Sequence, residues 1–425
     1  MAGRLLVRPL VAAGLTLALA GCWPAPGQGP DRRSHNPVET RITVDTVGDL
    51  TELWRAATGG AGDTGPPVVS AGSVHVTDTT QLVTFAAATG ARRWSTPEEP
   101  LIVPAVAPPL VDGSRLLVSW GWQIGYGGSW NSGSTWYDVA TGADLGALGR
   151  GIVRTLRGTR YVATSILGNP TVASGTFLDV GDTADAAGAW RTTLSFSMPG
   201  SSVVGWTDGT TLGTDAVFYA GAASSSFEET PTIGVRAWPL DPPPICDTFE
   251  QWPQYVIRCT TWFTPTAGTP VGGPVIGHGE DVLYVVTDAG ELLALDAGDG
   301  SVLWSTALGG VPSAMPALDD DTLFIPLDDG RLVAVPSAGC GAATCPVAWS
   351  TRTGGAGLQP AVAGGVVVVA TDAGTVRAFD ADGCGAPRCR ALWGADIGVA
   401  ATGAPAVSGG RVFVGTAGGG LVAFG

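Results

Sequence analysis

The feature that most constrains the fold is a unit of about 45 residues that recurs along the chain. Residues 287–304 (TDAGELLALDAGDGSVLW) and 77–94 (TDTTQLVTFAAATGARRW) have the same length and share an initial Thr-Asp and a final Trp. In the C-terminal half, the prolines that open successive units are 42, 44 and 45 residues apart: Pro274, Pro316, Pro360 and Pro405. A period of this length is typical of solenoids and propellers, in which each repeat is one supersecondary unit.

Each unit contains four short runs of β-branched or aromatic residues, separated by glycine and aspartate. Val, Ile and Phe fit pleated strands, and Asp-Gly or Gly-Gly pairs supply the positive φ angles of tight hairpins. Four antiparallel strands per unit, repeated along the chain, match the blades of a β-propeller. The sequence therefore predicts an all-β propeller of four-stranded antiparallel blades.

We count eight blades, with seven as the alternative because the second to fourth units are degenerate. The last unit begins at Gly403 and ends at Gly425 without a fourth strand. A Trp-centred strand over residues 51–56 stands unassigned at the other end of the chain. Pairing these two ends would close the ring and remove exposed sheet edges. We therefore expect one propeller domain over residues 50–425, closed by the N-terminal strand.

The complete unit runs from a proline-opened strand through Gly-x-Leu-x-Ala-Leu-Asp to Gly-x-x-x-Trp. It resembles the repeat of pyrroloquinoline-quinone-type propellers, most clearly over residues 66–94 and 270–425. The resemblance implies an eight-bladed ring in which one tryptophan of each unit docks on the neighbouring blade. Seven tryptophans hold this structural position: Trp54, Trp94, Trp190, Trp262, Trp304, Trp349 and Trp393.

The N-terminus has the marks of an exported lipoprotein. Arg4 and Arg8 precede an apolar run that is too short to cross a bilayer, as in a secretory signal. The run ends in Leu-Ala-Gly-Cys, which resembles the bacterial lipobox and implies cleavage before Cys22 and its acylation. Ordinary signal cleavage beside an incidental cysteine is the alternative. We expect a signal peptide over 1–21, followed by lipidated Cys22 and a flexible tether over 22–49, a segment rich in proline, glycine and polar residues.

The chain is acidic, with a formal net charge of −15, and all 22 of its basic residues are arginine. A field of this sign repels phosphate backbones, so we expect no nucleic-acid partner. The only membrane contact we expect is through the lipid anchor.

Six further cysteines form local pairs, which in an exported chain favour disulfides. The expected pairs are Cys246 with Cys259, Cys340 with Cys345, and Cys384 with Cys389. Zinc is the alternative, but two cysteines with four residues between them and no nearby histidine are a weak zinc signal.

No catalytic constellation stands out. The only histidines are His35, His75 and His278, and the acidic cluster Asp319–Asp321 aligns with hairpin turns of other units. Quinone-dependent members of the family are expected to carry adjacent cysteines over the cofactor, a calcium site and a catalytic aspartate. This chain has no Cys-Cys pair and no lysine to meet the quinone oxygens. We therefore expect no catalytic residue, no metal and no cofactor.

Two departures from the repeat, residues 120–137 and 239–263, concentrate aromatic side chains on glycine-rich or disulfide-pinned loops. Such side chains are enriched at binding hot spots. The candidate partner-binding residues are Trp120, Trp122, Tyr126, Trp130, Trp136, Phe249, Trp252 and Tyr255. The alternative is that they fill gaps in irregular blades; glycan stacking is a subordinate interpretation.

These observations favour a non-enzymatic binding scaffold, lipid-anchored at the extracytoplasmic face of a cell membrane, with protein partners in the envelope. Its architecture is similar to that of the lipid-anchored propeller that assists outer-membrane β-barrel assembly, although fold alone does not imply function. The alternative is a sensor that binds a quinone or small ligand, or a quinone-dependent dehydrogenase-like protein.

Overall fold

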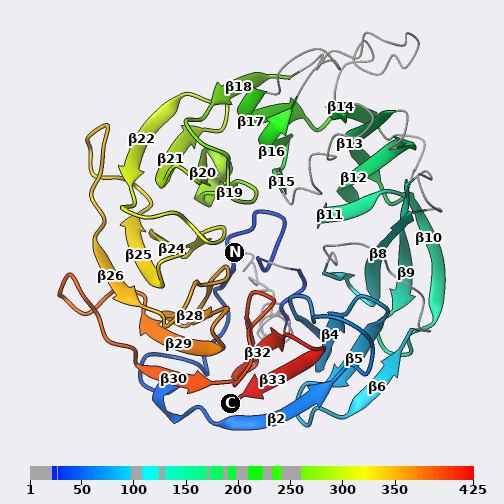
Figure 1. Cartoon of the computed structure of the whole chain (residues 1–425), viewed down its shortest axis with the longest axis horizontal. Helices are drawn as coiled ribbons and strands as arrows, with labels where there is room; N and C mark the ends of the chain where they lie inside the picture. Colours follow the sequence, from blue (N-terminus) through cyan, green and yellow to red (C-terminus); the bar gives the residue numbers. More distant parts are fainter. Residues whose placement is uncertain are drawn as a thin grey trace, which may run out of the picture.

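The computed structural model describes residues 22–25, 27–96, 108–123, 130–169, 173–184, 190–197, 209–223, 232–241 and 260–425. Across these ranges the chain forms eight four-stranded antiparallel blades arranged in a ring (Figure 1), which confirms the predicted eight-bladed propeller. Helix is confined in this part of the chain to the short 3-10 turns η1 (Val47–Asp49) and η4 (His278–Glu280). Neither turn has the length of a membrane span, and no other helix in the described part has it.

In every blade the first strand lies at the central channel and the fourth at the rim (Figure 1). Blades 1 to 4 comprise β3 (Val68–Ser70), β4 (Ser73–Thr77), β5 (Leu82–Ala86) and β6 (Arg92–Ser95); β7 (Leu110–Asp112), β8 (Arg115–Gln123), β9 (Trp130–Asp138) and β10 (Asp144–Arg150); β11 (Ile152–Arg157), β12 (Arg160–Asn169), β13 (Ala173–Asp182) and β14 (Trp190–Ser197); and β15 (Thr210–Leu212), β16 (Ala216–Ala223), β17 (Thr232–Pro239) and β18 (Trp262–Pro265).

Blades 5 to 8 comprise β19 (Val275–Ile276), β20 (Val282–Thr287), β21 (Glu291–Asp296) and β22 (Val302–Ala307); β23 (Ala317–Leu318), β24 (Thr322–Pro326), β25 (Arg331–Pro336) and β26 (Trp349–Arg352); β27 (Ala361–Ala363), β28 (Val366–Ala370), β29 (Thr375–Asp380) and β30 (Trp393–Asp396); and β31 (Ala406–Ser408), β32 (Arg411–Thr416), β33 (Gly420–Phe424) and β2 (Glu52–Ala57). A further short strand, β1 (His35–Asn36), pairs in parallel with β27.

The two ends of the chain close the ring as the repeat predicted. Strand β2 pairs antiparallel with β33, from Glu52 opposite Phe424 to Ala57 opposite Gly420. Blade 8 thus takes three strands from the C-terminus and its outer strand from the N-terminal part (Figure 1). This closure leaves no gap in the circle of blades.

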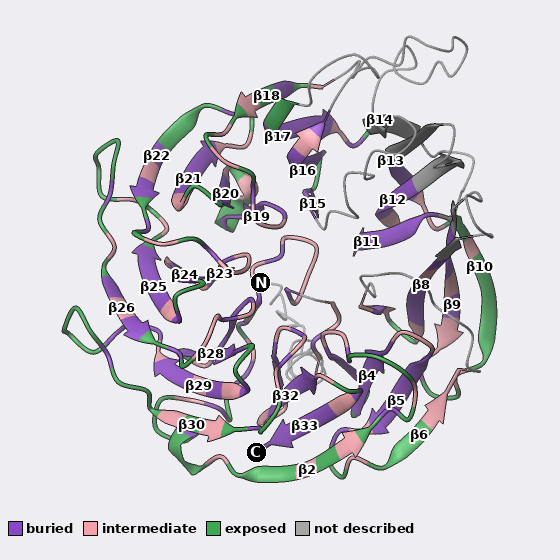
Figure 2. Cartoon of the chain, in the orientation of Figure 1, coloured by how far each residue is buried: buried purple, intermediate pink, exposed green. Residues whose placement is uncertain are grey.

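The hydrophobic core lies between blades. Strands in the middle of a blade are covered on both faces, so they read as near-continuous apolar runs such as Val366–Ala370, in which every residue is buried. The fourth strands at the rim alternate between exposed and covered residues (Figure 2). Burial therefore falls from the inner strands to the rim.

The repeated tryptophans lie on fourth strands and contact the next element around the ring. The indole Nε1 atoms of Trp54, Trp94, Trp262 and Trp393 donate to the carbonyl oxygens of Ala87, Val139, Ala297 and Leu50 at 3.2, 3.1, 3.0 and 2.8 Å. The rings of Trp304 and Trp349 lie against Gly339 and Gly383, where a Cβ atom would come within 2.8 Å of each ring. The side chain of Trp190 lies outside the described residues.

Two disulfides join Cys340 to Cys345 and Cys384 to Cys389. Each closes a loop that lies along the rim strand of the preceding blade. In the first loop, the Cys345 N–H donates to the Ser305 carbonyl at 2.8 Å, and the Ser305 N–H donates to Ala343 at 2.9 Å. The loops thus cover sheet edges that would otherwise be open to pairing. Cys246 and Cys259 lie outside the described residues.

The main difference from the sequence-based expectation concerns residues 22–49, expected to form a flexible tether. Trp23 is only 2 % exposed, and Ile42 and Val47 are buried in the cluster shared by blades 7, 8 and 1. The segment is ordered because its apolar side chains enter gaps between these blades and its backbone pairs with the ring. Proline and glycine content alone therefore misled the prediction of an unpacked chain.

Candidate functional site

Residues 22–36, here called the inner segment, run around the inside of the channel; residue 26 lies outside the described part. The segment begins beside blade 1, where Trp23 pairs antiparallel with Val69 of β3. It ends beside blade 7, where β1 pairs with β27. Figure 1 shows this N-terminal part of the chain in the middle of the ring. The channel is a candidate site because the first strands of all eight blades surround it.

The inner segment satisfies the inner sheet edges of six blades in the same way. In each, the backbone N–H of an equivalent first-strand residue donates to a carbonyl oxygen of the segment, over 2.8–3.3 Å. The donor and acceptor pairs are Val69 to Trp23, Val111 to Pro24, Leu212 to Pro30, Ile276 to Asp31, Leu318 to Arg33 and Val362 to Ser34. Side chains reach the other two blades: Arg32 donates to the Arg154 carbonyl of β11 at 3.3 Å, and Asn36 donates to the Val407 carbonyl of β31 at 2.9 Å.

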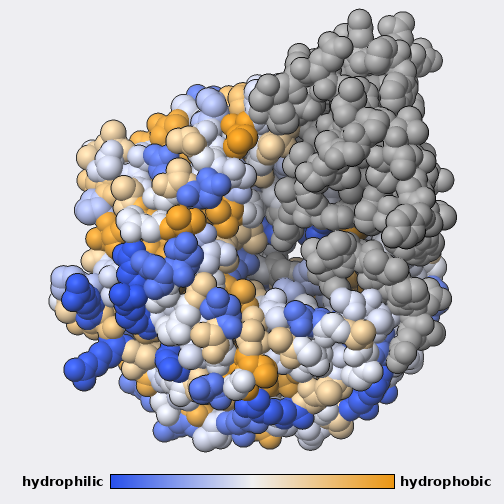
Figure 3. Space-filling model, in the orientation of Figure 1, coloured by the Kyte–Doolittle hydropathy of each residue, from blue (hydrophilic) through white to orange (hydrophobic). Residues whose placement is uncertain are grey.

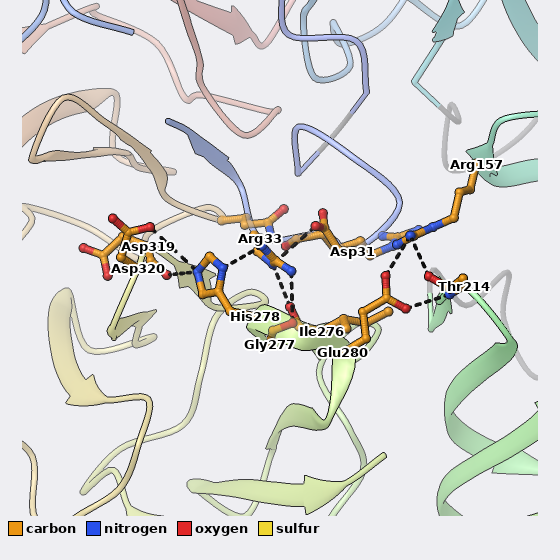
Figure 4. A network of polar contacts seen from close by, with 12 residues as sticks. Asp31, Arg33, Arg157, Thr214, Ile276, Gly277, His278, Glu280, Asp319 and Asp320 are labelled. Carbon is orange, nitrogen blue, oxygen red and sulfur yellow. Dashed lines mark hydrogen bonds and ion pairs between the residues drawn. The ribbon is translucent and has the colours of Figure 1, made fainter. Parts of the chain in front are cut away.

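Arg33 makes several side-chain contacts between the segment and the ring (Figure 4). Its guanidinium donates to the carbonyl oxygens of Ile276 and Gly277 at 2.9 and 3.0 Å, and lies 3.0 Å from Nδ1 of His278. Because a guanidinium only donates, Nδ1 must accept, and the ring proton sits on Nε2. Nε2 is 2.9 Å from the carbonyl oxygen of Asp319. The imidazole therefore bridges the segment and the turn of blade 6.

A second contact of this network joins blades 3, 4 and 5 (Figure 4). One carboxylate oxygen of Glu280 accepts from Arg157 at 2.7 Å, and the other accepts from the Thr214 N–H at 2.7 Å. Burial alone would raise the pKa of Glu280, but the hydrogen bonds from Thr214 and the charge of Arg157 hold it below its usual range. The carboxylate is thus engaged as an ion-pair partner rather than poised as a base.

Two other titratable groups near His278 have shifted pKa values. Burial raises the pKa of Asp319 to about 6, but its Oδ1 accepts from the N–H groups of Asp321 and Thr322, as expected for the predicted hairpin turn. Burial lowers the pKa of His35. Within the described ranges, no three His, Cys, Asp or Glu side chains come together as a metal site. In this network Arg33 joins the inner segment to Ile276, Gly277 and His278 of blade 5, and Glu280 joins blades 3, 4 and 5 to one another.

A cavity of about 350 Å³ opens between blades 5 and 6 beside this network. Its walls are mainly apolar, with polar groups at His278, Asp320 and Ser337. The apolar lining residues are Val282, Tyr284, Leu303, Trp304 and Leu318. The volume is at the lower end of the range for small-molecule sites.

The predicted aromatic binding residues are only partly placed. Trp120 is half-buried and donates from Nε1 to Thr135 Oγ1 at 3.1 Å. Trp136 is 6 % exposed, with the guanidinium of Arg115 4.4 Å from its ring centroid, and it packs in the core between blades 2 and 3. This differs from the expected binding role because the Trp136 side chain on β9 is buried against blade 3. The side chains of Trp122, Tyr126, Trp130, Phe249, Trp252 and Tyr255 lie outside the described residues.

Sequence analysis did not identify the inner segment or its network. Arg33 and His278 are 245 residues apart, and no local pattern joins them. One signal was present: Trp23 opens a stretch otherwise free of large apolar residues, and a solvated tether has no use for it.

Three stretches of the chain, residues 43–202, 249–339 and 311–425, match a family model described as outer membrane protein assembly factor BamB. Curated protein sequences give no match.

Among solved structures, the chain is similar to BamB from Moraxella catarrhalis (14 % identity, TM-score 0.56, covering 88 % of this chain and 99 % of that one). It is also similar to quinohemoprotein alcohol dehydrogenase from Comamonas testosteroni (14 %, 0.62, 98 % and 82 %) and to a europium-containing methanol dehydrogenase (12 %, 0.65, 95 % and 98 %). At these identities the likeness concerns the fold.

Proposed function

The chain belongs to the family of outer membrane protein assembly factor BamB, and from this premise we propose that it is a non-enzymatic binding scaffold of the cell envelope. The observation that carries the proposal is the inner segment, which bonds to the inner edges of the blades. With the channel edges occupied by the chain itself, partner contacts fall to the two faces and the rim. The expected partners are envelope proteins; glycan binding is subordinate.

The proposed location is the extracytoplasmic face of a membrane, with a lipid on Cys22. Residues 1–21 read as the signal peptide and Leu-Ala-Gly-Cys as the acylation motif. Two or more acyl chains give stable anchoring, whereas one chain binds only marginally. The thiol and the new amine of Cys22 together provide the attachment points that this requires.

A quinone cofactor is implied by some fold relatives, and we tested its fit against the residues of this chain. The channel edges that a central ligand would approach are hydrogen-bonded to the inner segment. Arg33 binds His278 and backbone carbonyl oxygens, and Arg157 pairs with Glu280. The sequence has no adjacent cysteines and no lysine. These residues do not fit the group, so we derive no reaction through it; this supports the non-enzymatic interpretation.

A second candidate function is binding of a small ligand, favoured by the cavity between blades 5 and 6. Trp304 and Tyr284 provide apolar walls, and His278 and Asp320 provide polar groups. If this were the main function, a compound should co-purify with protein from the native host and be lost in Tyr284→Ala. Native mass spectrometry of wild type and variant tests this.

The scaffold proposal is tested by crosslinking on intact cells, comparing a loop variant with a rim control. Trp122→Ala/Trp130→Ala removes two proposed contact residues at the connection between β8 and β9, whereas Leu145→Ala changes a rim side chain that is 50 % exposed. We expect the double variant to lose a specific crosslinked protein that wild type and Leu145→Ala retain. Identical crosslinks in all three would refute the proposed contact loop. Fatty-acid labelling that persists in Cys22→Ser would refute the anchor.

A further inference from the structure

The direction of the inner segment fixes where Cys22 lies. In each blade the turns between strands one and two, and between strands three and four, lie on one side of the ring, here called the upper face. The turns between strands two and three lie on the opposite, lower face. Strand β3 runs toward the upper face, and Trp23 pairs antiparallel with its Val69. Cys22 therefore lies level with Ser70, one residue from the upper turn at Ala71–Gly72.

The other end of the inner segment leaves the channel on the same face. Strand β1 runs parallel to β27, so it also points toward the upper turns. Beyond it, Glu39 accepts from the Gly410 N–H in the upper turn of blade 8 at 3.0 Å. The carbonyl oxygen of Ile42 lies so near Gly364, in the upper turn of blade 7, that a Cβ there would come within 2.0 Å. Both ends therefore lie at the upper mouth.

We infer that the upper face lies against the lipid surface and that the lower face points away from it. This inference rests on the proposed lipid at Cys22. A free linker of the length expected from the sequence would span roughly 30 Å and permit every orientation. In the structure the ring begins at the next residue, because Trp23 is buried and hydrogen-bonded in both directions to Val69. Almost no flexible chain therefore separates an acyl group on Cys22 from the ring.

Charge does not set this orientation. Exposed acidic residues on the upper turns, such as Asp281, Asp299 and Asp320, are accompanied by exposed Arg41 and Arg388. On the one face drawn in Figure 3, hydrophilic and hydrophobic side chains are interspersed over the coloured surface. A face of mixed charge has no strong attraction to a bilayer. The direction of the inner segment is therefore the determinant, and the protein without lipid should not bind vesicles.

The orientation assigns the partner surface. The lower face carries the turns 78–81, 288–290, 328–330, 372–374 and 417–419, which lie between second and third strands. With the upper face at the lipid, these turns and the rim are what a protein partner in the envelope meets first.

The test compares two variants that each add one cysteine to the chain in place of a small exposed side chain. Ser114→Cys lies in the upper turn of blade 2, and Ala373→Cys lies in the lower turn of blade 7. Lipidated protein in phosphatidylcholine vesicles is treated from outside with a polyethylene-glycol maleimide, with unsubstituted protein as background. We expect Ala373→Cys to label several-fold faster than Ser114→Cys. In a Cys22→Ser background, which releases the ring, the two should label at equal rates.

The outcomes separate this inference from the proposed anchor. Lipid on Cys22 together with equal labelling of the two sites, or faster labelling of the upper site, overturns the orientation alone. Absence of lipid on Cys22 by mass spectrometry overturns the anchor, and the orientation with it. Retention of Cys22→Ser on vesicles would show that a surface patch holds the ring, which also overturns the inference.

Discussion

Replacing Trp23 with alanine distinguishes a packed inner segment from a free tether, because the two arrangements place this side chain in opposite environments. Trp23 is 2 % exposed and belongs to the cluster of blades 7, 8 and 1, where it packs with Val69 and Val74 among others. Truncating a buried tryptophan to alanine costs about 3–5 kcal/mol of unfolding free energy. A tether would give a change within about 0.5 kcal/mol.

Denaturant unfolding of purified protein in the soluble Cys22→Ser background measures this difference. Val44→Ala is the matched control, since Val44 lies further along the same N-terminal part and is 37 % exposed. Its unfolding free energy should stay within about 0.5 kcal/mol of the parent. The backbone pair between Trp23 and Val69 remains available in Trp23→Ala, so the loss reports the side chain alone.

Trypsin supplies an independent measurement. The chain has no lysine, so cleavage occurs only after arginine, and Arg32 in the inner segment is 4 % exposed. The bond between Arg32 and Arg33 should resist cleavage in the parent protein and become sensitive in Trp23→Ala, as read by intact mass. Rapid cleavage there in the parent, together with unchanged unfolding of Trp23→Ala, would refute a packed inner segment.

Three further predictions concern the ring. Trp54→Ala should lower the unfolding free energy by about 3 kcal/mol, since Trp54 closes blade 8 onto blade 1. The control Leu53→Ala changes a side chain that is 44 % exposed and should cost less than about 1 kcal/mol, so equal effects in urea titration would contradict the closure. Burial lowers the pKa of His75 to about 3, so His75 stays neutral in the folded protein while the unfolded chain binds a proton there below about pH 6.5. The unfolding free energy should therefore fall by about 3 kcal/mol from pH 7 to 4.5. His75→Gln should flatten this pH dependence. Replacing Cys340 and Cys345 together by serine should lower the unfolding free energy by at most about 2 kcal/mol and leave the circular dichroism spectrum unchanged. A larger loss would show that this disulfide stabilises more of the ring than its own loop.

The blades and their closure were predictable because the residues that specify each blade lie close together in the sequence. A blade needs four short runs of β-branched or aromatic residues, turns with positive φ and one tryptophan, and all three recur within about 45 residues. The final unit lacked a strand and the N-terminus offered one, so pairing of Trp54 with the last blade followed from counting. Even the degenerate second blade kept its strands, although its extra tryptophans hid the repeat and made buried Trp136 look like a contact residue.

The inner segment was not predictable in the same way, because its partners have no sequence signature. The ring offers it backbone N–H groups, such as those of Val111 and Ile276, and any extended chain can accept from them. Its proline and glycine content equals that of a solvated linker, which is what composition alone favours. Arg33 meets His278 only when blade 5 lies beside the inner segment, so this contact depends on the topology of the ring.

If the chain is exported as proposed, the packing of the inner segment also sets an order of events during that export. The segment cannot complete its circle until Val407 of β31 is available, and the ring cannot close until β33 has crossed the membrane as well. In the finished ring Trp23 is buried, one residue beyond the expected cleavage and acylation site. Enzymes that act there need an extended, accessible chain, so on the proposed route lipid must be attached before the fold forms. A precursor that folded first would present Cys22 only partly exposed, directly beside the buried Trp23.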